Sequence, residues 1–327
     1  MTSPLVITHP SSFRHHPPGH PESPERIAAI EAALVADPRL KGLSVLALDL
    51  SGETPVPGAA ATRAALAGLH DAALIDEIFR RCEDAEAHDA GGWIDADTYI
   101  GPGSLEAACA TVLSACEAVR RAVDDDPPTT FSFCRPPGHH ATRAQAMGFC
   151  LFNNVAAAAQ CALDGGLQRV AIVDFDVHHG NGTQDIFYQR SDVLYISTHQ
   201  WPLYPGTGAE SERGSGAGEG RTLNVPMPAG SGDEGYIRVF DDAVLPALDA
   251  YAPELLLVSA GFDAAAEDPL AGMEVSTPGF AQLAGRLLDA AERLCGGRSA
   301  WVLEGGYDLD SLGAGAAAVV AEATRRG

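Results

Sequence analysis

The sequence predicts an α/β fold, a single doubly wound, mostly parallel β-sheet with helices on both faces. Short apolar runs rich in β-branched residues alternate along the chain with longer amphipathic stretches. Several of these runs end abruptly in glycine and reactive polar residues, which is typical of strand ends beside a ligand crevice. No internal repeat or linker-like segment divides the 327 residues, so we expect one domain over residues 1–327.

The expected strands are short apolar runs bounded by glycine, proline or polar residues. The clearest is Val170-Ala171-Ile172-Val173, a continuous run of the kind that fills a buried parallel strand. We expect strands over residues 5–8, 130–134, 170–173, 193–198, 222–225, 254–260 and 299–303.

The expected helices lie between these strands. Pro24 stands near the first turn of one helix, and Asn153 and Asn154 stand at the start of another, where such residues are favoured. We expect helices over 24–36, 104–123, 153–164, 183–189, 233–250 and 277–294, two more within 59–89, and a final one after residue 307.

Three segments are expected to be irregular. The segment 13–24 contains four prolines, which prevent regular structure. We therefore favour a loop there over a second metal site built from its three histidines, His15, His16 and His20. The other two segments, 91–103 and 205–220, are rich in glycine.

Bulk composition excludes several classes of function. The net charge is −23, from 21 basic and 44 acidic residues, so we expect no binding to nucleic acid. Such a surface either attracts cationic substrates to a cleft or serves only solubility. The sequence contains no signal-like start and no apolar run long enough to span a membrane, so we expect a cytoplasmic protein. The seven cysteines are scattered, which predicts reduced, mostly buried thiols.

Reactive residues follow four of the expected strands. They occur in Gly138-His139-His140, in the segment 174–181, in Gly261-Phe262-Asp263 and in Gly305-Gly306-Tyr307. In a parallel sheet the carboxyl ends of the strands lie along one edge, so residues far apart in sequence meet there. We therefore expect one site composed of all four segments.

Three of these residues form a metal-binding set. Asp176 and His178 are two positions apart after a strand, so their side chains point to the same side. With Asp263 they supply two carboxylates and one imidazole, which suits zinc with coordination positions left open. Iron is not strongly excluded by the same ligands. A metal held there would act as a Lewis acid and lower the pKa of its water.

The remaining polar residues supply acid–base groups. His139 and His140 are candidates for a general base and acid, and Asp174 and Asn181 for the groups that hold those imidazoles. Tyr307 offers a phenol that can donate to a developing oxyanion. The reaction that these residues predict is metal-assisted hydrolysis of a carbonyl compound, most naturally an amide.

At this point several motifs resemble those of a known family, the zinc-dependent histone deacetylases. The likeness is strongest to the class II branch and to bacterial histone-deacetylase-like amidohydrolases, and it implies an arginase/deacetylase-like fold. The motifs are HPESPERI (20–27), RPPGHHA (135–141), GFCLFNN (148–154), VDFDVHHGNGTQ (173–184), SAGFDAA (259–265), DPL (268–270) and EGGYDL (304–309).

The resemblance assigns roles to the catalytic residues and makes the metal-binding set the zinc ligands. It makes His140 the general base and acid, and His139, paired with Asp174, its electrostatic partner. Asn181 matches the group that orients His140, and asparagine there favours the class II branch. Tyr307 matches the tyrosine that polarises the acyl carbonyl, which implies a competent deacetylase.

The resemblance also implies a substrate tunnel. Phe149, preceded by Gly148, and Tyr204 match the walls of a narrow tunnel for an acyl-lysine side chain. Tyr204 departs from the usual phenylalanine, which leaves the polarity of the rim and the acyl preference open. Asp97 matches a rim carboxylate that binds the substrate backbone, and Leu270 occupies the position after the DP pair.

Potassium is a further cofactor that the resemblance implies. In the family it is held by main-chain oxygens beneath the zinc site and stiffens the loop that presents the ligands. The matching positions are Asp174, Asp176, His178, Ser197 and Thr198, with a second site near Phe187, Arg190 and Val193.

Three other functions are compatible with parts of this sequence. Arginases share the fold but need two further aspartates for a second metal, where this chain has Gly180 and Ala265. Acetylpolyamine amidohydrolases remain the main alternative, although polyamine-selective class II relatives carry glutamate where this chain has Leu270. A catalytically silent acyl-group-binding protein would lack a core residue, and none is missing. The expected partner is therefore an acylated lysine side chain, a small acylamide or an acetylpolyamine. The sequence is also compatible with a homo-oligomer.

Overall fold

The computed structural model describes residues 3–50, 56, 58–124 and 126–326. Its main sheet has eight strands in the order β2-β1-β5-β10-β9-β6-β7-β8, and every neighbouring pair is parallel. This confirms the predicted sheet. The strands are β1 (Leu5–Thr8), β2 (Ser44–Ala47), β5 (Thr129–Ser132), β6 (Val170–Asp174), β7 (Val193–Gln200), β8 (Thr222–Met227), β9 (Leu255–Ala260) and β10 (Ser299–Leu303).

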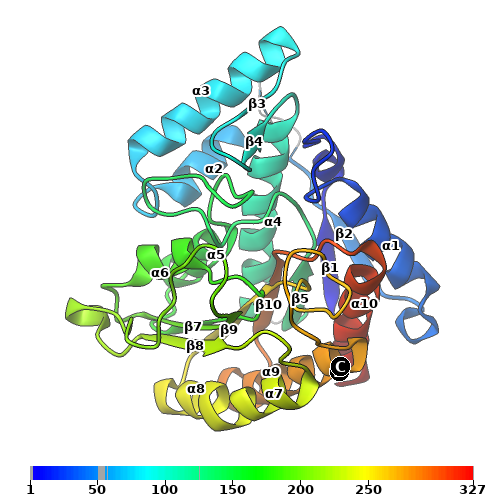
Figure 1. Cartoon of the computed structure of the whole chain (residues 1–327), viewed down its shortest axis with the longest axis vertical. Coiled ribbons are helices and arrows are strands. Elements are labelled where there is room, and N and C mark those ends of the chain that lie inside the picture. The colour runs from blue at the N-terminus through cyan, green and yellow to red at the C-terminus, as the bar shows by residue number, and fades with distance from the viewer. Residues whose placement is uncertain (1–2, 51–55, 57, 125, 327) are drawn as a thin grey trace.

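Helices cover both faces of this sheet (Figure 1). Helices α2 to α5 pack on one face, and α1 and α7 to α10 pack on the other. The helices are α1 (Glu25–Ala36), α2 (Ala59–Leu66), α3 (Ala72–His88), α4 (Ser104–Val123), α5 (Asn154–Asp164), α6 (Asn181–Phe187), α7 (Asp233–Val239), α8 (Leu245–Tyr251), α9 (Thr277–Cys295) and α10 (Leu309–Arg326).

Each face of the sheet has its own apolar core because successive strand residues point to opposite faces. In β6, Ala171 and Val173 belong to one core while Val170 and Ile172 belong to the other. Strands buried on both faces are apolar at every position, which explains why the run over 170–173 is continuous rather than alternating.

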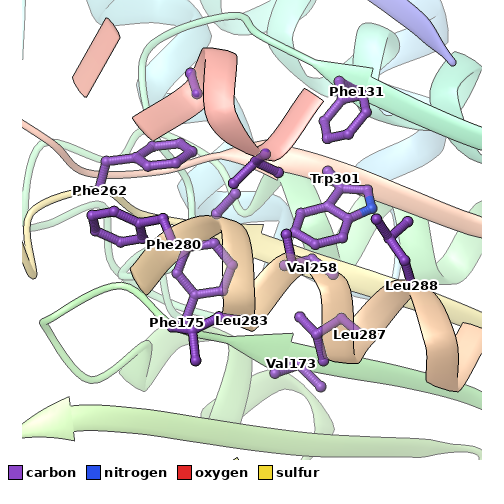
Figure 2. Close-up of a cluster of buried hydrophobic side chains, with 14 of the residues drawn as sticks. Phe131, Val173, Phe175, Val258, Phe262, Phe280, Leu283, Leu287, Leu288 and Trp301 are labelled. Carbon is purple, nitrogen blue, oxygen red and sulfur yellow. The ribbon is translucent and has the colours of Figure 1, made fainter. Parts of the chain in front are cut away.

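The core under α9 shows how a helix is fixed to the sheet (Figure 2). Leu283 and Leu287 are four residues apart, so they lie on one face of α9, and both are buried. Trp301 of β10 is fully buried beside Phe131, with ring centroids 5.5 Å apart. Each such side chain contributes about 1.5–3 kcal/mol of transfer free energy on burial. This packing fixes β10 beside β5 and β9.

The structure departs from the sequence prediction at three places. Strand β2 was not predicted, because three of its four residues are exposed at the sheet edge and show no apolar pattern. A two-stranded hairpin, β3 (Gly92–Trp93) and β4 (Tyr99–Ile100), lies in the expected loop over 91–103. The helix expected over 233–250 is interrupted by a π-helical turn, Phe240–Val244, between α7 and α8.

Membrane-spanning helices are not found among the described residues, since none is both long and apolar enough. All seven cysteines are free thiols, and five of them are buried. The predicted cytoplasmic localisation and the single domain over residues 1–327, whose ends fall outside the described residues, stay predictions.

Candidate active site

The four predicted segments meet at the carboxyl edge of the sheet. They follow β5, β10, β9 and β6, which are consecutive in the sheet order. The edge therefore collects residues that lie between positions 135 and 307 of the sequence. This is the crevice position that open parallel sheets use for ligands.

The predicted metal-binding set is assembled in the structure. Asp176, His178 and Asp263 are buried, and their ligand atoms lie within 4.8 Å of one another. The Gly305 N–H donates to Asp176 Oδ2 (2.7 Å), and the Val177 N–H donates to Asp263 Oδ1 (2.9 Å). These two backbone N–H groups therefore fix one oxygen of each carboxylate. The other two oxygens approach His178 Nδ1, Asp176 Oδ1 at 3.2 Å and Asp263 Oδ2 at 3.1 Å.

The electrostatics of this set fit a cation. Burial and the neighbouring Asp176 raise the pKa of Asp263 to about 7. Burial would lower the pKa of His178, but the two carboxylates raise it to about 10. Two buried carboxylates around one imidazole carry excess negative charge, and a divalent metal would neutralise it. The donor set thus fits zinc, and no other group of three or more such side chains occurs in the described part of the chain.

The two adjacent histidines have different partners. His139 Nδ1 hydrogen bonds with Asp174 Oδ2 (3.0 Å), which also accepts the hydroxyl of Tyr195 (3.0 Å). His140 Nδ1 hydrogen bonds with Asn181 Oδ1 (2.8 Å). The structure therefore contains both predicted imidazole pairs, with the two rings 4.1 Å apart between centroids.

These partners shift the two imidazoles in opposite directions. Burial would lower the pKa of His139, but Asp176 and Asp174 raise it well above its usual value. Burial lowers the pKa of His140 well below its usual value, and the neighbouring His139 and His178 lower it further. One ring is thus held cationic and the other neutral, a separation that suits acid–base chemistry.

A cavity of about 230 Å³ leads to this cluster. The five predicted substrate-binding residues all line it. The Phe149 and Tyr307 rings meet edge to face at 5.6 Å, and the Tyr204 ring lies 5.1 Å from that of His140. The lining residues are Asp97, His140, Gly148, Phe149, His178, Leu203, Tyr204, Leu270 and Tyr307.

Two features of the backbone require glycine at position 148. Its φ of +58° lies in the left-handed region that favours glycine. A Cβ at this position would lie 2.5 Å from the imidazole of His140. Gly148 therefore acts on the site through His140, and a side chain here would displace that ring.

Sequence reasoning missed four supporting residues. Glu304 is fully buried and accepts the N–H groups of residues 138 and 139. Asp268 accepts the Tyr307 N–H (2.7 Å), and buried Arg26 donates to the Gly306 carbonyl (2.7 Å). Tyr195 holds Asp174, as described above. The motifs that contain the first three were noticed, but their contacts join segments up to 280 residues apart.

The predicted potassium positions lie on β6, on β7 and in the loop between β6 and α6. Asp174 of β6 is paired with Ser197 of β7, and the Thr198 hydroxyl approaches the Asp174 carbonyl at 3.5 Å. At the second position the Arg190 N–H donates to the Phe187 carbonyl (2.9 Å), just before β7 begins at Val193.

The histidines of segment 13–24 lie outside the metal-binding set. His15 is buried and hydrogen bonds through Nδ1 to Ser104 Oγ (2.8 Å), and His16 is exposed. The ring of His20 packs edge to face against Phe149 at 4.4 Å. Apart from a short 3₁₀ turn over Pro10–Phe13, the segment is irregular, as predicted.

Comparison with known proteins identifies the family. A model of the histone deacetylase domain matches residues 20–323. The chain belongs to the histone deacetylase family. It is 41% identical over 322 residues to histone deacetylase 14, chloroplastic, of Arabidopsis thaliana, covering 94% of this chain and 74% of that protein.

Two further similar proteins bear on its chemistry. The histone deacetylase-like amidohydrolase of Pseudomonas aeruginosa is 40% identical, over 93% of this chain and 77% of that protein. The crystal structure of an acetylpolyamine aminohydrolase from Burkholderia pseudomallei matches with a TM-score of 0.81 at 34% identity, covering 97% of both chains. The family and its fold place this protein among the deacetylase-type hydrolases.

Proposed function

We propose that the protein is a zinc-dependent amidohydrolase that removes acetyl or other acyl groups from acyl-lysine or a similar acylamide. One observation carries the proposal. One narrow cavity reaches the ligand set Asp176, His178 and Asp263 at His178, and it is also lined by His140 of the histidine pair and by Tyr307. A metal-binding protein without catalysis would need the first group only.

The metal-binding set would hold the ion, and iron could replace zinc in the cell. When bound, the ion supplies Lewis-acid polarisation of the acyl carbonyl and of the attacking water. The side chains around it carry out the proton transfers.

His140 and Tyr307 would act on the two sides of the acyl group. Neutral His140 accepts a proton from the attacking water and then returns it to the leaving amine. Cationic His139 beside it stabilises the negative charge that develops. Burial raises the pKa of Tyr307 well above its usual value, so its phenol keeps a proton to donate to the acyl oxygen.

The tunnel would select the substrate by shape. Phe149 and Tyr204 flank the alkyl chain, and Leu270 makes the same wall apolar. Asp97 lines the same cavity, and its carboxylate would accept a substrate N–H group. Tyr204 is 40% exposed, and its hydroxyl would add a polar atom to the tunnel wall.

Potassium would bind through main-chain oxygens of Asp174, Asp176, His178, Ser197 and Thr198, with a second ion near Phe187, Arg190 and Val193. This proposal is supported by the adjacent buried positions of β6 and β7. A cation there would stiffen the segment that presents the metal ligands.

An acetylated polyamine is the second candidate substrate. It is favoured by the net charge of −23 and by the similarity to the Burkholderia pseudomallei acetylpolyamine aminohydrolase. Leu270 weighs against it, because an apolar side chain offers a second ammonium no counter-charge. Neither candidate involves nucleic acid or a membrane, and homo-oligomer formation stays a prediction.

The deciding experiment compares kcat/KM of the zinc-loaded protein for an acetyl-lysine peptide and an acetylated polyamine, with chelated protein as control. A peptide preference above about a hundredfold, roughly 2.7 kcal/mol in transition-state binding, would establish a lysine-deacetylase-like enzyme. The reverse preference would establish the polyamine enzyme. Turnover that survives chelation would overturn the metal-dependent proposal.

A further inference from the structure

Glu304 lies immediately after β10 and bridges three neighbouring strand ends. Its Oε2 accepts the N–H of Gly138 (2.7 Å) and of His139 (3.1 Å), in the segment after β5. Its Oε1 accepts the hydroxyl of Ser259 in β9 (3.2 Å). The side chain is fully buried, so water cannot replace these contacts.

We propose that Glu304 is a positioning residue for the histidine pair, acting through the backbone of residues 138 and 139. This rests on the proposed function of that pair. Glu304 accepts hydrogen bonds from the N–H groups of Gly138 and His139. These bonds fix the backbone from which the side chains of His139 and His140 extend. The pairs with Asp174 and Asn181 act on the Nδ1 atoms and fix the orientation of each ring, not the position of its backbone.

The geometry explains why a long side chain with two acceptor oxygens is needed here. One oxygen must reach from β10 across to the segment after β5, while the other remains on β9. Aspartate keeps the charge but withdraws the oxygens by about one methylene length. Glutamine keeps the length and one carbonyl oxygen for both N–H groups, while its amide can donate to the Ser259 hydroxyl.

The test compares Glu304→Gln with Glu304→Asp, using Ser259→Ala as a control that removes the other contact of the same carboxyl group. Displacement of reacting groups by about 1 Å costs on the order of a hundredfold in rate. We expect Glu304→Asp to lower kcat at least about tenfold with KM and zinc content unchanged, and Glu304→Gln and Ser259→Ala to stay within about threefold of wild type.

Hydrogen exchange supplies a readout that does not depend on activity. In Glu304→Asp, the peptide containing residues 138 and 139 should exchange faster while peptides from α9 and α10 remain protected. A Glu304→Gln variant as defective as Glu304→Asp, or unchanged exchange in Glu304→Asp, would overturn the positioning role. An inactive wild-type protein would refute the proposed function instead. The exchange result would still test whether Glu304 holds the backbone of residues 138 and 139.

A second, independent observation concerns a pair of cysteines on neighbouring helices. Cys116 of α4 and Cys161 of α5 have their sulfur atoms 2.7 Å apart. Both are partly exposed, whereas the other five cysteines are buried, and both line an apolar cavity of about 610 Å³. Their sulfur atoms need to approach by less than about 1 Å to reach bonding distance.

We infer that Cys116 and Cys161 are a modification site that forms a reversible disulfide with a low-molecular-weight disulfide as oxidant. One protein thiolate attacks a sulfur of the oxidant, releases one thiol and forms a mixed disulfide. The second protein thiolate then attacks the protein sulfur of that bond and releases the second thiol. The two protein thiols are oxidised and the reagent is reduced to two thiols.

This cross-link would enclose the segment 116–161, which contains His139, His140 and Phe149. Constraining that segment in the unfolded chain should stabilise the folded state. After incubation with oxidised glutathione, we expect peptide mapping to recover Cys116 joined to Cys161 and Tm to rise by several degrees, reversibly with reductant. Cys116→Ser should lose both effects, and Cys295→Ser should keep them. A persistent glutathione adduct or an unchanged Tm would overturn the inference.

Discussion

Two histidines that are adjacent in sequence have opposite pKa shifts because different groups surround them. The carboxylates of Asp174 and Asp176 favour the cationic form of His139. His140 faces an amide, and its neighbours include another imidazole on each side, so burial dominates and favours the neutral form. The difference therefore follows from the two carboxylates near His139 and from the burial of His140 beside two other imidazoles.

Tyr307→Phe tests the phenol at the same scale. The aromatic ring keeps its contact with Phe149, while the phenol that we propose as a donor to the acyl oxygen is lost. We expect zinc content and KM to be unchanged and kcat to fall by about 100–1,000-fold, as for removal of one oxyanion donor. Steady-state kinetics with metal analysis measures this. Full activity would show that the proposed role of Tyr307 is wrong.

At the scale of elements, strand ends and the loops that follow them place the site. Glycines let those loops approach one another closely, as at Gly305, where a Cβ would lie 2.1 Å from Asp263 Oδ2. The loop after β5 is similarly tied to α5, since the Asn153 side chain caps that helix at the Ala156 N–H. The site is therefore as rigid as the packing of the elements behind it.

Gly148→Ala tests how a loop positions His140. The added methyl group would contact the imidazole at 2.5 Å, so the ring must move. We expect kcat to fall at least about tenfold, because small displacements of a catalytic group are costly. Gly42→Ala is the matched control. Gly42 also has a positive φ, +88°, but nothing lies within 4 Å of its Cβ position, so this variant should lose stability and keep its activity per folded molecule.

At the scale of the whole molecule, buried ionisable groups link stability to pH. His70 is a clear case, since its Nδ1 donates to the Thr142 carbonyl (2.7 Å) and its Nε2 accepts the Asn153 N–H (3.0 Å). Acceptance at Nε2 requires the neutral ring, with its proton on Nδ1. Burial lowers the pKa of His70 to about 4. As the pH falls below 6.5, His70 therefore becomes protonated in the unfolded chain before it does so in the folded protein.

His70→Gln should remove that dependence. Between pH 6.5 and about 4 the wild-type advantage in unfolding free energy should shrink by up to about 1.4 kcal/mol per pH unit, because the unfolded state alone gains the proton. Above pH 7 the advantage should be constant. Urea unfolding of both proteins from pH 7.5 to 5 measures the difference. A wild-type advantage in unfolding free energy that does not change with pH would contradict this assignment.

Metal removal tests the whole fold as well as the site. Without a cation, Asp176 and Asp263 are buried carboxylates facing each other, and the folded state loses the binding free energy of the metal. We expect chelation to lower Tm by several degrees and to abolish activity, with both restored by zinc. Asp176→Ala should bind no zinc and show no activity. An active, zinc-containing Asp176→Ala protein would refute the proposed ligand set.

The sequence by itself determined the sheet, most helices and the set of reactive residues. Apolar periodicity reflects burial directly, so the run over 170–173 identified a central strand, and polar residues after strands identified the ligand edge. Strand β2 was missed because exposed edge residues have no such pattern, and the π-helical turn between α7 and α8 was missed because its sequence remains compatible with a helix.

Only the tertiary structure decided which partner each reactive group has. The sequence contains Glu304, Asp268 and Arg26, but their contacts with Gly138, Tyr307 and Gly306 span 166, 39 and 280 residues. A hydrogen bond is made or lost by a change of a few tenths of an ångström in the donor–acceptor distance. That distance follows from how the strands and helices pack. Local sequence patterns specify elements, whereas this packing specifies the pairing of Cys116 with Cys161 and the charge of each histidine.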